Sequence, residues 1–147
     1  LVQGNHAHVL IFGCLSQHEL SSLRQQEQLI EKLTNDSGSI ELQLGRSLGK
    51  ALAEAAELPA SEYEGKNAIR IDSEVPYLWA RNLMLLRLVD CPTVLLEPYI
   101  ANSVNAYARL QDALESRANG ELPKEDDILV EYADAVVAGV LDTYGQK

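Results

Sequence analysis

The stretch that most constrains the fold is a short apolar run that ends abruptly at a carboxylate. Residues 93–96 (Thr-Val-Leu-Leu) are apolar or β-favouring, which predicts a strand buried on both faces in the middle of a parallel sheet. Pro98 lacks a backbone N–H and biases Glu97 away from helical backbone, so the strand should end there. Asn102 is a good N-cap for a helix over residues 103–117.

Glu97 would then lie in the crevice at the carboxyl ends of the strands, where open α/β sheets bind ligands. Two interpretations of this residue follow. A carboxylate at a strand end can cap the next helix or pair with an arginine for stability, and it can also act as a general base on a bound ligand. Arg81 is one candidate partner, because it interrupts an apolar stretch and a guanidinium is almost never buried unpaired.

The composition predicts a single domain over residues 1–147 and argues against several classes of partner. The chain has 147 residues, of which 46% are hydrophobic, and this is enough for one core. Its formal charge is −10 and its 12 Lys and Arg residues do not cluster, which argues against nucleic acid. No apolar run approaches the ~18 residues that span a bilayer, and no signal peptide opens the chain. Because the sequence begins at Leu1 rather than Met, we expect a processed product or a piece of a longer protein.

The expected elements follow the order of an α/β fold, in which helices cover a mostly parallel or mixed sheet. Residues 6–14 predict a strand that is central or next to central. Residues 74–89 are apolar over most of a helical circumference and predict a buried helix, with Pro76 in its first turn. The other expected elements are a surface helix or mobile insertion over residues 16–33, an amphipathic helix from Ser39 to residue 58, a short strand over residues 68–72, and a last helix capped by Asp126.

Histidines and cysteines are the remaining candidates for chemistry. His6 and His8 lie two residues apart and would share one face of a strand, a spacing that suits a metal ion and also occurs in exposed histidines at the start of a strand. Cys14 and Cys91 fit neither a disulfide framework nor a zinc knuckle. Both lie at the ends of predicted strands, so we expect two buried free thiols, or one disulfide if those strands are neighbours.

Four motifs occur in a recognisable order between Ser39 and the C-terminus. They are Ser39 with Leu48-Gly49, Arg81-Asn82-Leu83, the run Pro-Thr-Val-Leu-Leu-Glu-Pro-Tyr-Ile-Ala-Asn at residues 92–102, and Tyr132-Ala133-Asp134-Ala135 with Gly139. This order resembles the C-terminal part of the catalytic domain of zinc-dependent N-acetylmuramoyl-L-alanine amidases of the amidase-3 type. That family has Pro-x-Val-Leu-x-Glu-x-Gly-Phe-x-x-Asn at the third motif, where Pro98-Tyr99 here replaces Gly-Phe.

The resemblance implies a three-layer αβα fold and hydrolysis of the amide between the lactyl group of N-acetylmuramic acid and L-alanine in peptidoglycan. In that family the glutamate ending this strand, which corresponds to Glu97, faces a catalytic zinc and acts as general base on its bound water. Asn102 would shape the loop beside such a site, and Arg81 would hold a carboxylate or a saccharide oxygen. The resemblance also implies work in the cell envelope or outside the cell, on peptidoglycan or a muropeptide.

The zinc ligands of the family are two histidines and a glutamate, and their motifs do not occur in this sequence. A catalytic zinc needs three protein ligands and an open position. The only histidines in the sequence are His6, His8 and His18. The sequence therefore does not identify the metal ligands. Three hypotheses remain. The chain is the C-terminal piece of a zinc amidase domain, an amidase-like binding or structural module without the metal, or an unrelated α/β domain in which Arg81 and Glu97 pair for stability.

Overall fold

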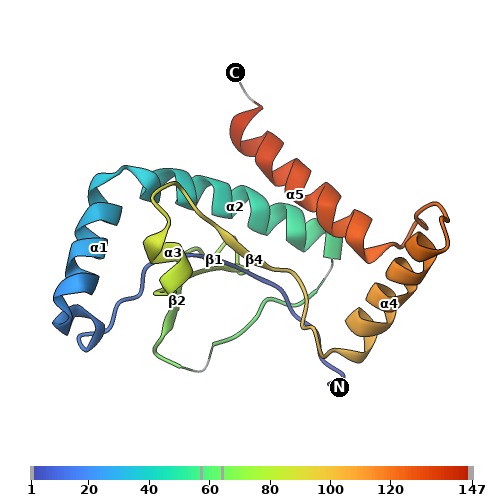
Figure 1. Cartoon of the computed structure of the whole chain (residues 1–147), viewed down its shortest axis with the longest axis horizontal. Helices are drawn as coiled ribbons and strands as arrows, with labels where there is room; N and C mark the ends of the chain where they lie inside the picture. Colours follow the sequence, from blue (N-terminus) through green and yellow to red (C-terminus); the bar gives the residue numbers. More distant parts are fainter. Residues whose placement is uncertain (1, 57, 64, 146–147) are drawn as a thin grey trace.

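The fold is α/β, as predicted, and is built on a four-stranded mixed sheet (Figure 1). The structure is a computed structural model that describes residues 2–56, 58–63 and 65–145. Its elements are β1 (His8–Phe12), a 3-10 turn η1 (Glu19–Ser21), α1 (Leu23–Thr34), α2 (Ser37–Ala56), β2 (Ala68–Arg70), β3 (Leu78–Arg81), α3 (Met84–Leu88), β4 (Leu95–Glu97), α4 (Val104–Ala118) and α5 (Ile128–Tyr144).

The strand order is β2-β3-β1-β4, with β1 and β3 parallel and both outer strands antiparallel to their neighbours. The prediction of a central strand within residues 6–14 is confirmed, because β1 pairs on both sides and Val9 and Leu10 are fully buried. The prediction for residues 93–96 is wrong in position. Strand β4 begins only at Leu95, lies at the edge of the sheet, and is half-buried where it was expected to be covered on both faces.

Helices lie on both faces of the sheet, but unequally. One face is covered by α2, with α5 packed against it, and its core joins Val9, Ile11 and Leu78 of the strands to Leu52 and Ala135 (Figure 1). Within the described residues, the opposite face is covered by the five-residue α3, whose Leu86 packs with Leu10 and Trp79, together with Tyr63 from the loop before β2. Helix α4 packs beside the start of α5 and forms a third, smaller core.

The buried helix expected over residues 74–89 does not form. Residues 78–81 form β3 instead, and only residues 84–88 are helical. The reason is tertiary: a continuous apolar run suits a buried strand as well as a buried helix, and β3 satisfies its backbone groups by pairing with β1 on one side and β2 on the other. Asn82 and Leu83 separate the two short elements.

Several helix boundaries lie one or two residues from their predicted positions. Helix α2 begins at Ser37 because Asp36 adopts a left-handed backbone conformation (φ +58°), which lets the chain leave α1 and turn at once. The last helix is capped by Asp127, whose carboxylate accepts hydrogen bonds from the N–H groups of Leu129 and Val130. Ser103, and not Asn102, is the N-cap residue of α4. The described residues between α2 and β2, 58–63 and 65–67, form an irregular loop.

The packing of α5 on α2 depends on Gly139. A Cβ atom at this position would lie 2.8 Å from Cα of Leu48 and 3.0 Å from its backbone nitrogen. We expect Gly139→Ala to lower the free energy of unfolding by about 1–3 kcal/mol, measured by urea denaturation, because the backbones must move apart. Gly38→Ala, in the first turn of α2 with no atom near its Cβ, is the control and should be neutral or stabilising by up to ~1 kcal/mol. Equal effects of the two substitutions would contradict a close α2–α5 contact.

Candidate functional site

Glu97 lies at the opposite end of the sheet from the predicted crevice. Because β4 runs antiparallel to β1, the end of β4 meets the beginning of β1, and Glu97 pairs with His8 in the strand register. The carboxyl ends of the two parallel strands, at Phe12 and Arg81, lie at the other end. The prediction that Glu97 faces a crevice at the carboxyl ends of parallel strands is therefore wrong.

Glu97 and His8 nevertheless form a close pair on the sheet face that carries Tyr63. Oε2 of Glu97 lies 2.5 Å from Nε2 of His8, and the hydroxyl of Tyr63 lies 3.0 Å from the same nitrogen. The His8 side chain is only 8% exposed, whereas that of Glu97 is 46% exposed. A buried histidine thus holds a carboxylate that solvent or a ligand can reach.

The contacts indicate which nitrogen of His8 carries the proton. An Nε2–H group can donate to the Glu97 carboxylate, whereas an unprotonated Nε2 would repel it. The neutral ring then keeps Nδ1 as an acceptor, and this buried atom has no hydrogen-bond partner among the described residues. The expected effect of the pair is to fix the orientation of the carboxylate, as a histidine does for a charged neighbour.

Burial shifts the pKa values of His8 and Tyr63. It lowers the pKa of His8 from its usual 6.5, against the opposing effect of the nearby Glu97 carboxylate, and His6 and Arg81 lower it further. Burial also raises the pKa of Tyr63, although Arg81 acts in the other direction. At neutral pH the pair therefore consists of a neutral imidazole and an accessible carboxyl group, which is the arrangement expected of a proton acceptor.

A cavity of about 530 Å³ opens beside the pair. It is bordered by His6 and His8 on one side and by the segment that follows β4, residues 96–101, on the other. Asn5 helps to hold that segment, since its side-chain oxygen accepts a hydrogen bond of 2.9 Å from the backbone N–H of Ile100. Glu97 thus faces a space large enough for part of a ligand and a water molecule.

The other two predicted site residues do not pair with Glu97 among the described contacts, although Arg81 lies beside Tyr63. Arg81 makes no ion pair among the described residues, and its guanidinium carbon lies 5.4 Å from the centre of the Tyr63 ring. The suggested pairing of Arg81 with Glu97 is wrong because β1 lies between their strands and the register places them at opposite ends. Asn102 is exposed and does not border the cavity; its carbonyl accepts a hydrogen bond from the N–H of Val2.

The residues that the structure describes do not form the zinc site that the resemblance implies. His6 and His8 do share a face, with ring centres 5.9 Å apart, but Nε2 of His8 already bonds to Glu97. His18 lies elsewhere, just before η1, and is exposed. Within the part of the chain that the structure describes, no three His, Cys, Asp or Glu side chains form a group that could hold a metal ion.

Both cysteines are free, which was one of the two expected outcomes. Cys14 is half-buried, and its thiol donates to the carbonyl of Lys66 at 3.6 Å. Cys91 is exposed, so the prediction that both thiols are buried is wrong. The segment from Cys91 to β4 is irregular and lies at the surface, and the residue therefore does not end a buried strand.

Tyr63 is the site residue that sequence reasoning missed. It lies in a loop with no apolar period, and its ring contacts His8 and Trp79 edge-on, with ring centres 5.4 Å and 5.0 Å away. No local pattern marks such a residue. The signal that does exist is the His-x-His spacing, because the rings of His6 and His8 stack 5.9 Å apart, although β1 begins only at His8.

The buried histidine should make folding stability depend on pH. The pKa of His8 is lower in the folded chain than the 6.5 of an unperturbed histidine, so between these two values the unfolded chain binds more protons. The contribution is fully present above about pH 6.5 and is lost as the pH falls toward the lower, folded value. We expect His8→Gln to flatten this part of the stability curve, measured by urea denaturation at several pH values. His18→Gln, at an exposed position, should leave the slope unchanged, and a slope that survives in His8→Gln would contradict the assignment.

Comparison with known proteins adds no relative, because no protein-family model, curated protein or solved structure matches this chain. Among the described helices, none is long and apolar enough to cross a membrane.

Proposed function

We propose that this chain is a peptidoglycan amide hydrolase of the N-acetylmuramoyl-L-alanine amidase type, working in the cell envelope or outside the cell. One observation carries the proposal. Glu97, the residue that matches the general base in the resembling motif, is exposed at a cavity and held by a buried histidine. In this role Glu97 accepts a proton from the attacking water and returns it to the leaving amine of L-alanine.

The neighbouring residues have supporting roles in this proposal. His8 donates its Nε2–H to the carboxylate and fixes the direction in which the other carboxylate oxygen points. Tyr63, which contacts the same ring, limits its rotation. The segment over residues 96–101 forms the wall against which the muropeptide would lie. A zinc ion belongs to the resembling family, but the described side chains do not supply three donors for it, so the roles above are assigned without it.

A second candidate function is a non-catalytic module that keeps the cavity and binds muropeptides. The specific observation in its favour is the same lack of a three-donor group among the described residues. Catalysis by a carboxylate on an unactivated water is slow, because a metal normally supplies much of the activation in amide hydrolysis. Such a module would bind muropeptide without releasing the peptide.

The two functions are separated by one experiment. Purified chain is incubated with a defined muropeptide, with and without added zinc and with a chelator, and both binding and release of the peptide are measured. Release above the protein-free rate supports the hydrolase. Binding without release in any of these conditions supports the module, and absence of both contradicts the two proposals together.

A further inference from the structure

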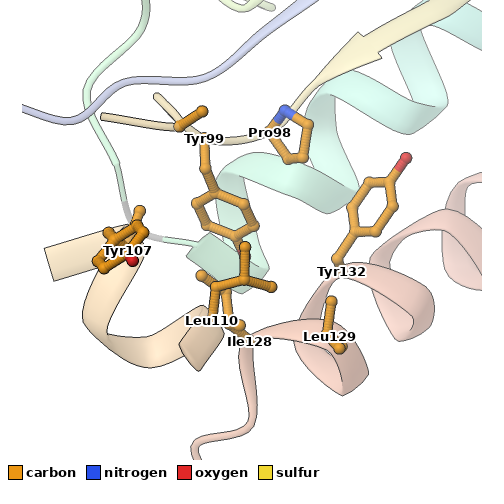
Figure 2. Close-up of a pocket in the computed structure, with 9 residues that line it drawn as sticks. Pro98, Tyr99, Tyr107, Leu110, Ile128, Leu129 and Tyr132 are labelled. Carbon is orange, nitrogen blue, oxygen red and sulfur yellow. The ribbon is translucent and has the colours of Figure 1, made fainter. Parts of the chain in front are cut away.

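A second pocket lies directly behind the segment that borders the Glu97 cavity. It is formed where α4 meets α5, has a volume of about 170 Å³, and shares Pro98, Tyr99 and Ala101 with the first cavity. Its other walls come from Tyr107 and Leu110 of α4 and from Ile128, Leu129 and Tyr132 of α5. Figure 2 shows the rings of Tyr99 and Tyr132 on opposite sides of this space, with Leu129 near its base.

Hydrogen bonds to Glu131 fix the position of Tyr99 in the wall of the pocket. The Tyr99 hydroxyl donates to Oε1 of Glu131 at 2.5 Å, and Arg109 donates to the other oxygen of Glu131 at 2.6 Å. Arg109 also donates to the backbone carbonyl of Asp126, which precedes α5. Burial and the Glu131 carboxylate raise the pKa of Tyr99, so the phenol stays neutral. The ring of Tyr99 is therefore fixed at its polar end while its face remains available to the pocket.

The size and chemistry of the pocket define what it would bind. Its lining is almost entirely carbon, since the Tyr99 hydroxyl is engaged by Glu131. An enclosed apolar cavity of about 150 Å³ binds benzene or xenon; this pocket has a similar volume but is open to solvent beside the exposed residues Ala101 and Tyr107. A charged or strongly polar group would lose its hydration here without gaining a partner. An uncharged group of up to about one benzene ring fits these limits.

We infer that the α4–α5 pocket is a subsite for an uncharged apolar group, aliphatic or aromatic, carried by the ligand whose polar part lies against Glu97. Pro98, Tyr99 and Ala101 line both cavities, so the two spaces adjoin at this segment and one ligand can contact both. The assignment to a single ligand rests on the proposed function. The affinity of the pocket for an apolar group is independent of the proposed function, and it is measured separately.

The test of the pocket uses benzene as the probe, followed by methyl NMR of the whole chain. We expect saturable shifts at the methyl groups of Leu110, Ile128 and Leu129. Ala101→Phe adds a ring at an exposed position on the rim and should weaken benzene binding at least 10-fold. Tyr107→Ala, which removes a half-exposed wall, should weaken it as well. Ala108→Phe, at an exposed position of α4 that does not border the pocket, is the matched control and should leave benzene binding unchanged.

A second experiment tests whether the pocket and the Glu97 cavity bind the same ligand. Benzene should compete with muropeptide, and Ala101→Phe should raise the KM for release more than it lowers kcat. Saturable benzene shifts without any muropeptide release would support the subsite and overturn the proposed hydrolase. Release without benzene shifts, or benzene binding that fails to compete with muropeptide, would overturn the subsite and leave the hydrolase standing.

Discussion

Glu97→Gln should reduce muropeptide release at least about 100-fold, because a positioned general base contributes roughly 10²–10⁴ to such a reaction. The amide has the shape of the carboxylate but cannot accept the proton of the attacking water. Its oxygen can still accept the Nε2–H of His8, so the contact with the buried histidine is kept. The side chain is 46% exposed, so folding should change little. The measurements are kcat and KM for release, together with the thermal unfolding temperature of both proteins.

The control for this substitution is Glu54→Gln, an exposed carboxylate on α2 that lies away from the Glu97 cavity. It removes the same charge and should leave release unchanged. His8→Gln tests whether His8 acts by positioning the Glu97 carboxylate. It should reduce kcat by less than Glu97→Gln does, and it should alter the pH profile of release. Full release by Glu97→Gln with normal folding would remove Glu97 from the mechanism.

The parts of the fold that could be predicted are those with a local pattern of their own. Strand β1 has a compact apolar run closed by Gly13, and α2 and α5 have apolar residues at helical spacing, so each was expected close to its observed place. Strand β3 has no such signature, because a run that is apolar on every side is compatible with a strand and a helix. Its pairing with β1 decides the matter, and that pairing joins residues far apart in the sequence.

The same distinction explains the candidate site. Glu97 could be found because Pro98 ends the strand directly after a carboxylate. Its partner His8 could not be predicted, because the direction of β4 decides which residue of β1 lies opposite Glu97. A parallel β4 would have brought Glu97 to the end of the sheet where Arg81 lies, whereas the antiparallel β4 brings it to His8. Tyr63 comes from a loop, and loop residues carry no period from which a contact can be predicted.

A buried ion pair, which no sequence pattern indicated, joins α1 and α2 to the segment that precedes β4. Lys32 of α1 lies 2.6 Å from Oε1 of Glu41 on α2, with the two side chains only 3% and 2% exposed. Lys32 also donates to the carbonyls of Val89 and Cys91, and Oε1 of Glu41 accepts from the backbone N–H of Thr93. The pair therefore ties two helices to the segment that leads into β4.

Lys32→Met should lower the free energy of unfolding by about 3–5 kcal/mol, because it leaves the Glu41 carboxylate buried without a counter-charge. The double substitution Lys32→Met with Glu41→Leu should cost less than the two single substitutions added together, since a matched apolar pair leaves no buried charge. Urea denaturation of the four proteins measures this coupling, and Lys50→Met, at an exposed position of α2, is the control for loss of a lysine. Additive costs would show that the two side chains do not interact. If the coupling is present, the single variants should also loosen residues 89–93, so amide hydrogen exchange there should rise before exchange in β1, whose residues belong to the central core.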